Sequence, residues 1–257
     1  MIDIHSHILP GLDDGAKTIE ESIAIAEEAV SVGITKMVAT PHHQHPSFPL
    51  LDGSHLHDAV AELNQELAKQ MIPLTVLPGQ EIRLYGDIQS DLASGASLSL
   101  GNSKYVLVEF PSNDIPVYAN RLFYDLGSQG YIPVIAHPER NKVIMDSPNK
   151  LYELIKNGAL AQLTSSSLTG YFGKDIQKLS EELMEASLVH VIASDVHNTA
   201  NRTLRMREAY AYVEERFDSN LMYEYQENAR LMIENKHIYL NPPERVGKKK
   251  KKLFGFF

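Results

Sequence analysis

The stretch IDIHSHILPGLDDG, residues 2–15, starts like a strand and carries His5 and His7, with Asp13 and Asp14 just before a glycine. Side chains two positions apart on a strand point the same way, so both histidines face one side of the predicted strand. A His-x-His pair alone is more often a coincidence than a metal site. The rest of the chain must decide between an ordinary strand and turn and the first half of a metal site.

Strand-like and helix-like segments alternate along the chain. Short apolar or β-branched runs lie at residues 2–7, 36–42, 74–82, 105–110, 132–137, 159–164 and 189–197. Helical patterns lie between and after them, at residues 18–33, 55–70, 116–129, 147–157, 175–187 and 200–234. The first of these has Thr18 as a capping residue, Glu21 three residues later and Gly33 as a stop. Seven strands alternating with helices predict a parallel β/α barrel.

Histidines and carboxylates lie at the ends of most of these predicted strands. They are His5, His7, His42, Glu81, Glu109, His137, Asp195 and His197. The carboxyl ends of parallel strands converge on one mouth, and in a closed barrel the first and last strands are neighbours. Mixed nitrogen and oxygen ligands suit Mn²⁺, Fe or Zn²⁺, and burying so many ionisable groups without a cation would be costly. The pattern therefore predicts a metal site.

Composition excludes several classes of protein. The 257 residues are 43% hydrophobic, contain no cysteine and carry a net charge of −9. Such a chain can build a large core, but it has no disulfide, thiolate metal site or cysteine nucleophile. Clustered basic residues are needed for phosphate-backbone affinity, so we expect no nucleic-acid partner. Without a signal-peptide pattern or a long apolar run, the protein is expected to be cytoplasmic.

Six segments together resemble the PHP (polymerase and histidinol phosphatase) superfamily. They are DIHSHILPGLDDG, VATPHH, GQEI, VEFP, IAHPERN and ASDVHN, in order between residue 2 and about 205. Within it they are most similar to the manganese-dependent protein-tyrosine phosphatases of bacterial capsule and exopolysaccharide clusters, the CpsB/YwqE type. The resemblance implies a distorted, TIM-like seven-stranded β/α barrel, here residues 1–247, with its active site at the C-terminal ends of the strands.

The resemblance also implies a trinuclear metal cluster, with Mn²⁺ as the expected metal and Fe, Zn or Mg as alternatives at some positions. The implied ligands are His5, His7, Asp14, His42, Glu81, Glu109, His137, Asp195 and His197. They divide as His5, His7, Glu81 and Asp195 around one ion, Glu81, Glu109 and His137 around a second, and Asp14, His42 and His197 around a third. Asp14 precedes the turn glycine as in the family motif, whereas the residues alone do not choose between Asp13 and Asp14.

The implied activity is hydrolysis of phosphotyrosine by direct attack of a metal-bound hydroxide. The family uses the arginine equivalent to Arg140 for substrate, and Arg202 or Arg205 is a candidate second phosphate contact. A salt-bridging or solvated arginine is the alternative reading of each. Hydrolysis of histidinol phosphate or another small phosphoester is the alternative activity, and a catalytically silent scaffold is a third hypothesis. His43, His45, His55 and His57 are interpreted as solvated, with contact to substrate as the alternative. His190 begins a predicted strand, away from the ligand end, and His237 lies in the C-terminal segment, so neither is a candidate ligand.

The expected partner is a phosphotyrosine protein, such as a membrane-associated bacterial tyrosine kinase of capsule synthesis. Residues 248–252 are five lysines, and residues 253–257 read LFGFF. Consecutive lysines repel one another, so residues 248–257 are predicted to form a flexible tail. Lysines beside aromatic residues suit contact with an anionic membrane, which would bring the protein to the inner face of the membrane. A solvated chain end is the alternative.

Overall fold

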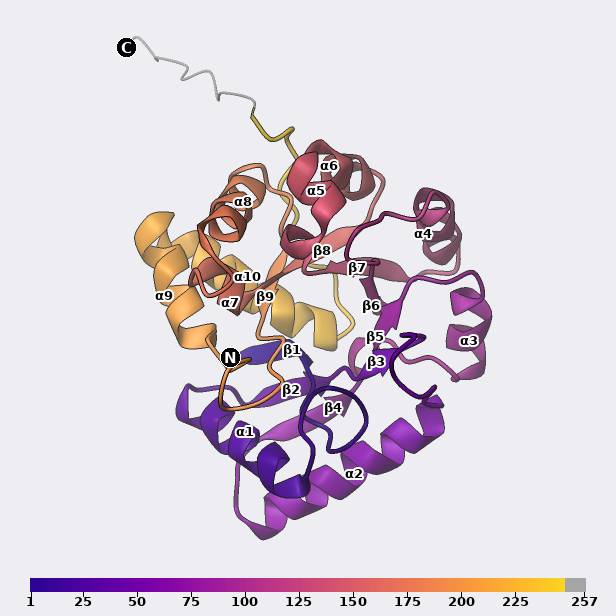
Figure 1. Cartoon of the computed structure of the whole chain (residues 1–257), viewed down its shortest axis with the longest axis vertical. Helices are drawn as coiled ribbons and strands as arrows, with labels where there is room; N and C mark the ends of the chain where they lie inside the picture. The colour runs from indigo at the N-terminus through magenta and orange to yellow at the C-terminus, as the bar shows by residue number, and fades with distance from the viewer. Residues whose placement is uncertain (248–257) are drawn as a thin grey trace.

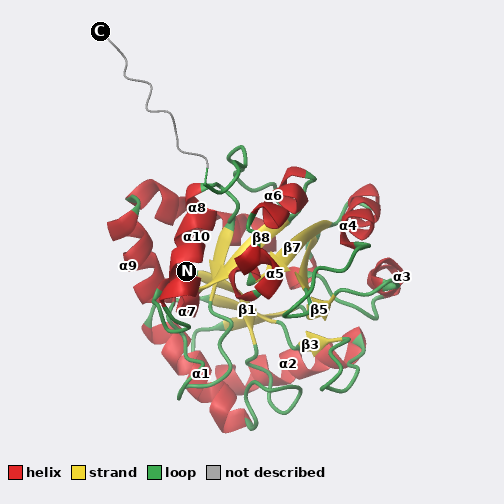
Figure 2. Cartoon of the chain, turned by 45° about the horizontal axis from the view of Figure 1, so that its top comes forward, coloured by secondary structure: helices red, strands yellow, loops and turns green. Residues whose placement is uncertain are grey.

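Short parallel strands alternate with helices in the computed structural model, which describes residues 1–247 (Figures 1 and 2). The strands are β1 (Ile2–Ser6), β2 (Lys36–Ala39), β3 (His42–His43), β4 (Thr75–Pro78), β5 (Glu81–Arg83), β6 (Tyr105–Glu109), β7 (Ile132–Ala136), β8 (Leu160–Thr164) and β9 (Val191–Ala193). Each predicted strand segment contains at least one of them. The alternation therefore confirms the predicted α/β class.

The helices lie outside the strands for most of the chain (Figure 1). They are α1 (Ile19–Ser31), α2 (Gly53–Lys69), α3 (Ile88–Ser94), α4 (Ala119–Ser128), α5 (Lys142–Asp146), α6 (Asn149–Lys156), α7 (Ser165–Leu168), α8 (Lys174–Glu185), α9 (Met206–Arg216) and α10 (Ser219–Ile233), with short 3₁₀ turns at Leu100–Asn102 and Pro138–Arg140. Thr18 caps α1 by accepting the Glu21 N–H, as expected. Within residues 1–247, no helix is both long and apolar enough to cross a membrane.

The strands are hydrogen-bonded in two sheets. Their orders are β1-β2-β4 and β3-β5-β6-β7-β8-β9, and every neighbouring pair is parallel. One isolated parallel bridge joins Ser6 at the end of β1 to Val196 beyond β9. Because β3 follows β2 and β5 follows β4 after two residues each, the sheets run on from one another. The ladders of residues 1–247 do not form one closed barrel, so the closed seven-stranded form stays a prediction.

Helix α10 closes the amino-terminal ends of the strands. Ala229 and Met232 of this helix are fully buried among side chains that point to the inside of the sheets, such as Ile4 and Tyr105. The single helical pattern expected at residues 200–234 is in fact two helices. The chain turns at Phe217 (φ −117°, ψ −92°), and Asp218 then caps α10 by accepting the Leu221 N–H at 2.8 Å. The remaining, carboxyl end of the strands is the one that stays open.

Candidate metal centre

The strand registers bring the predicted ligands together at the open end. Parallel pairing of β3 with β5 sets His42 beside Glu81, and the pairing of β5 with β6 sets Arg83 beside Glu109. His137, just after β7, has a φ of 32°, and Asp195, just after β9, has a φ of 53°. Left-handed backbone is uncommon outside glycine and is a form of strain found at functional sites.

Glu81 is the centre of the cluster and is almost fully buried. Its Oε2 lies 3.4 Å from His5 Nε2, 3.4 Å from His7 Nε2 and 3.0 Å from His42 Nδ1. Its Oε1 lies 2.7 Å from His137 Nε2. One carboxylate thus faces four imidazoles that come from three different segments of the chain, at the ends of β1 and β7 and in β3, as expected for a bridging ligand.

Asp14 and Asp195 extend the cluster on its other side. Asp14 Oδ1 lies 3.2 Å from His197 Nε2 and 3.4 Å from His42 Nε2. Asp195 Oδ1 lies 3.4 Å from His7 Nε2. The structure therefore brings Asp14, the aspartate that the resemblance favoured, to the two histidines assigned with it.

Two observations show that this donor set fits metal ions. First, three groups each offer ligand atoms within 4.8 Å of one another: His7, Asp14, His42 and His197; His5, His7 and Glu81; and His42, Glu81 and Glu109. Second, five buried side-chain atoms of these groups have no hydrogen-bond partner within residues 1–247: Asp14 Oδ1, His42 Nδ1, Glu81 Oε2, Glu109 Oε2 and His197 Nε2. Buried polar atoms normally have partners, so a cluster of orphaned donors indicates cations.

This grouping differs in detail from the expected division among three ions. His7 lies with Asp14 and His42 as well as with His5, so it stands between the first and third expected sets. His137 and Asp195 fall in none of the three groups, although His137 contacts Glu81 and Asp195 contacts His7. The division itself stays a prediction.

The protonation of the cluster shows how its charges are balanced without a cation. Burial lowers the pKa of His42, but the nearby carboxylates of Glu81 and Asp14 outweigh it and raise the pKa to about 9. Burial and the nearby Glu81 raise the pKa of Glu109 to about 7. Metal binding at His42 and Glu109 would therefore compete with protons.

Residues outside the predicted ligand set fix the direction of the histidine rings. His7 Nδ1–H donates to Asp13 at 2.6 Å, and His5 Nδ1–H donates to Gln162 Oε1 at 2.9 Å. Both bonds leave Nε2 facing the cluster, as the outer partners of metal-binding histidines do. Gln162 was missed, although a polar residue within the apolar run ALAQLT was a signal. Gly15 lets the turn at residues 13–15 lie close to the backbone of His7, because a Cβ at this position would lie 2.1 Å from the His7 carbonyl oxygen.

Arginines surround the mouth of the cluster, and two of the three candidates reach its carboxylates. Arg140 pairs with Asp195, and Arg202 lies 3.2 Å from both Asp14 and Asp195. Arg205 instead lies over the ring of a tyrosine, 4.9 Å from its centroid. The sequence did not choose between Arg202 and Arg205, and the geometry favours Arg202.

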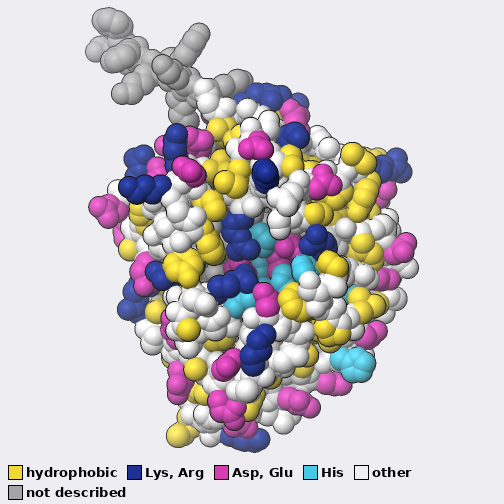
Figure 3. Space-filling view, in the orientation of Figure 1, with side chains coloured by type: hydrophobic (Ala, Val, Ile, Leu, Met, Phe, Trp, Pro, Cys, Tyr) yellow, Lys and Arg dark blue, Asp and Glu magenta, His cyan; other side chains and the backbone are white. Residues whose placement is uncertain are grey.

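Arg83 is a further arginine that sequence reasoning missed. Its Nη1 lies 3.6 Å from Glu109 Oε2, and its side chain is 24% exposed. The signal was available, because Arg83 follows Glu81 by two residues on the same strand and therefore shares its face. Figure 3 shows the result: histidine and acidic side chains lie in a hollow with Lys and Arg side chains around it.

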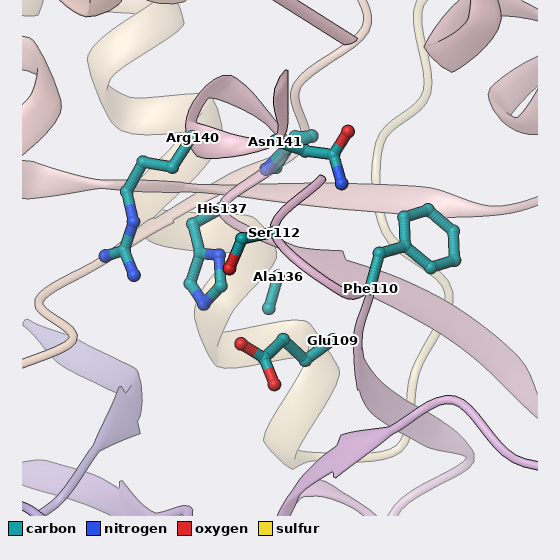
Figure 4. A pocket seen from close by; sticks show the side chains of 8 residues that line it. Glu109, Phe110, Ser112, Ala136, His137, Arg140 and Asn141 are labelled. Carbon is teal, nitrogen blue, oxygen red and sulfur yellow. The ribbon is translucent and has the colours of Figure 1, made fainter. Parts of the chain in front are cut away.

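A cavity of about 120 Å³ opens beside the cluster, between the ends of β6 and β7 (Figure 4). Its lining comprises Glu109, Phe110, Ser112, Ala136, His137, Pro138, Arg140 and Asn141. Two predicted ligands and the predicted phosphate-binding arginine therefore share one space.

The prediction that His43 is solvated was wrong. The side chain is buried, its Nε2–H donates to Ser97 Oγ at 3.0 Å, and its Nδ1 accepts from Gln80 at 3.2 Å. His43 follows His42 on a strand and so points away from the cluster. Its hydrogen bonds join β3 to Gln80, just before β5, and to Ser97 in the loop after α3.

Comparison with known proteins agrees with this site. The profile of a family described as "Capsular polysaccharide synthesis, CpsB/CapC" matches residues 1–237. The chain belongs to the CpsB/CapC family. It is 49% identical to the tyrosine-protein phosphatase YwqE of Bacillus subtilis, and the alignment covers 100% of both chains. It is 41% identical to the putative tyrosine-protein phosphatase CapC of Staphylococcus aureus, over 98% of each chain.

Solved structures of CpsB/CapC proteins support the same assignment. A chain from a study titled as structures of YwqE from Bacillus subtilis and CpsB from Streptococcus pneumoniae, "unique metal-dependent tyrosine phosphatases", superposes with a TM-score of 0.94 at 48% identity. The match covers 96% of this chain and 99% of that one. A Listeria monocytogenes lactonase, with a TM-score of 0.55 at 11% identity over 90% and 94% of the two chains, shares the fold alone.

Proposed function

We propose that this protein is a metal-dependent phosphatase that hydrolyses phosphotyrosine in proteins. The observation that carries the proposal is the set of buried, unpartnered donor atoms at the strand ends, with Arg140 and Arg202 beside them. Cations and arginines together are the groups that bind phosphoryl oxygens. The named activity of the CpsB/CapC relatives supports phosphotyrosine as the substrate.

The residues of the chain divide the work between holding cations and binding substrate. The proposed ligands are the nine named above, and bound cations there would supply Lewis acidity and a nucleophile at neutral pH. Arg140 and Arg202, which pair with Asp195 and Asp14 here, would turn their N–H donors to the phosphoryl oxygens. The phenolate of tyrosine is a good leaving group because the pKa of the tyrosine hydroxyl is about 10, so no residue is assigned as general acid. Without any cysteine, the chain cannot form a phosphocysteine.

Three Mn²⁺ ions are the proposed metal content, with Fe, Zn or Mg as alternatives at some positions. The mixture of imidazole and carboxylate donors supports Mn²⁺, Fe or Zn²⁺ over Ca²⁺, which prefers oxygen ligands. We also propose that β2 with β3, and β4 with β5, each act as one interrupted strand. The sheet orders and the Ser6–Val196 bridge then support a distorted barrel of seven strands within one domain, residues 1–247.

The test is phosphate release from a phosphotyrosine peptide by the metal-free protein before and after addition of Mn²⁺. We expect no release without metal and recovery when it is added. Histidinol phosphate in the same assay separates the alternative activity, since a higher kcat/KM for that compound would overturn the proposal. Equal release by the protein with and without verified metal would overturn the metal-dependent mechanism.

We further propose that the substrate protein is a membrane-associated tyrosine kinase of capsule synthesis and that the enzyme works in the cytoplasm, at the inner membrane face. The tail predicted at residues 248–257 lies outside the described residues, so this proposal rests on its sequence. Each lysine near an anionic membrane adds about 1 kcal/mol of binding. Sedimentation with anionic and neutral vesicles, for the full chain and a chain ending at Gly247, tests the proposal. Equal binding by both chains would contradict it.

A further inference from the structure

Two aromatic side chains lie against arginines at the rim of the metal centre. Phe172, in the loop between α7 and α8, lies under the guanidinium of Arg140, 5.2 Å from ring centroid to Cζ. Its neighbour Tyr171 lies under Arg205 at 4.9 Å, and the two rings meet edge-on at 5.3 Å. Tyr171 is 43% exposed and Phe172 is half-buried, so part of each ring faces solvent at the rim.

The loop that carries these rings is held in one shape. Gly170 (φ +76°) and Gly173 (φ +99°) take left-handed backbone on either side of the pair, a conformation that glycine adopts at little cost. The Tyr171 N–H donates to the Ser166 carbonyl and the Gly173 N–H to the Gly170 carbonyl, both at 3.0 Å. These hydrogen bonds hold the backbone of the loop, and so the attachment points of both rings, beside the site.

A second aromatic group lies against a predicted ligand, on the loop between β3 and α2. The ring of Phe48 is parallel to that of His42, with an interplanar angle of 3° and a centroid distance of 5.1 Å. His45 stacks on Phe48 at 4.9 Å. Phe48 is half-buried and thus also keeps an exposed part. Hydrophobic side chains are visible on both sides of the central hollow in Figure 3.

We propose that Phe172 and Phe48 contact the phenyl ring of the substrate and so select aryl over alkyl phosphates. The inference rests on the proposed phosphatase function. When Arg140 and the metal centre hold the phosphoryl group, the first ring carbon is a single oxygen atom away from phosphorus. The phenyl ring would then leave past side chains that adjoin Arg140 and His42, and the aromatic ones among them are Phe172 beside Arg140, with Phe48 and His45 beside His42.

Contact between aromatic rings favours phosphotyrosine over a phosphorylated alcohol side chain, because aromatic pairs gain energy beyond the area they bury. A phosphoserine offers no ring, and its phosphorus lies closer to the peptide backbone. The arginines and the metal centre act on the phosphoryl group that both substrates share. Phe172 and Phe48 are therefore specificity-determining residues rather than part of the phosphate-binding set.

The test compares Phe172→Leu and Phe48→Leu with the native chain on a phosphotyrosine peptide and on a phosphoserine peptide of the same sequence. Leucine keeps apolar volume but removes the aromatic face. We expect kcat/KM for phosphotyrosine to fall about tenfold, or about 1.4 kcal/mol, through KM, while the phosphoserine value is unchanged. Tyr223→Leu is the matched control, because Tyr223 is 61% exposed and adjoins Met1 and Ile2 at the opposite end of the strands.

Equal losses on both peptides would overturn the proposal, since they would show that Phe172 only holds Arg140 in place. An unchanged kcat/KM for phosphotyrosine in both variants would also overturn it.

Binding of phenylphosphonate and methylphosphonate to the Mn²⁺-loaded protein gives a second readout that needs no turnover. If the native chain hydrolyses no phosphotyrosine, the proposed function fails. Tighter binding of phenylphosphonate that Phe172→Leu removes would still support the aromatic contact, and equal binding of both ligands would overturn it.

Discussion

His190 and His197 lie just before and just after the same strand, β9, yet their surroundings differ completely. Both are buried, and burial is the main reason that the pKa of each is lowered to about 4. His190 Nδ1 accepts the Ala161 N–H at 3.1 Å, and its carbonyl accepts from Asn228 at 2.9 Å. His197 Nε2 has no hydrogen-bond partner within the described chain and faces Asp14 at 3.2 Å.

The difference shows that burial of a titratable group does not by itself indicate function. At the His190 end, the Nδ1, backbone N–H and carbonyl of this residue are each paired and α10 closes the structure, so burial stabilises the fold. At the His197 end, donor atoms are buried beside one another without partners, which costs free energy in the metal-free protein. Proteins keep such an arrangement where a bound ligand compensates it.

The largest expected effect comes from removing the unpaired histidine. His197→Asn deletes the nitrogen that faces the cluster, so phosphatase activity should fall by more than about a thousandfold, beyond the roughly hundredfold cost of losing an outer partner. Steady-state rates and bound metal per chain measure it. His190→Asn is the matched control, since the amide oxygen can accept the Ala161 N–H in place of Nδ1. The phosphatase rate of His190→Asn per folded molecule should not change. Similar losses of activity in both variants would contradict the distinction between a structural His190 and a metal-binding His197.

The next effect concerns a residue that binds substrate but no metal. Arg140→Ala should lower kcat by about 10²-fold to 10³-fold, the usual effect of removing one donor to a developing charge. Metal content should stay the same, because within residues 1–247 the Arg140 side chain pairs with Asp195 and with no other candidate ligand. An unchanged rate would remove Arg140 from the site. Loss of metal together with activity would make it a structural partner of Asp195.

Sequence reasoning could place the candidate ligands at one end of the strands for a physical reason. Side chains at i and i+2 share a strand face, and parallel strands converge at their carboxyl ends, so the His5/His7 pair and Asp195 could be placed together without coordinates. The outer partner Gln162 lies on a strand without a predicted ligand, and a polar residue in an apolar run signals a buried polar group without naming His5 as its partner. His43 was misjudged because loop-like composition hid a short strand.

The two sheets illustrate a second limit of the sequence. Hydrophobic patterning located the strand segments, but breaks such as that between β2 and β3 depend on how a ladder shifts in three dimensions. The end of α9 at Phe217 was also invisible to periodicity, since the apolar spacing continues into α10. Tertiary packing decides both features.

A smaller effect is expected from the outer partner of His7. Asp13→Asn keeps the shape of the side chain but replaces a carboxylate that accepts from His7 Nδ1 at 2.6 Å and from the His42 N–H at 3.0 Å. Loss of such a partner lowers metal affinity by about tenfold to a hundredfold. Titration of the metal-free protein with Mn²⁺ measures this shift. Saturating metal should restore most of the rate, whereas an Asp13 that ligates metal directly would leave the rate low.

The smallest expected effect is the contribution of His190 to the pH dependence of the free energy of unfolding. Burial lowers the pKa of His190 to about 4 in the folded chain, whereas an unfolded histidine titrates near 6.5. Between these values the unfolded state binds one more proton than the folded state. The stability that the neutral His190 contributes is therefore fully present above pH 6.5 and is lost as the pH falls towards 4. From pH 7.5 to 5.5 this one group should remove about 1.3 kcal/mol from the free energy of unfolding.

Urea unfolding of the metal-free native chain and of His190→Asn at both pH values isolates the contribution, because every other group titrates in both proteins. The native chain should lose more stability than the variant by that amount. Equal losses would mean that the buried His190 takes up its proton without unfolding, and the contrast between the two ends of β9 would then lie in hydrogen bonding alone.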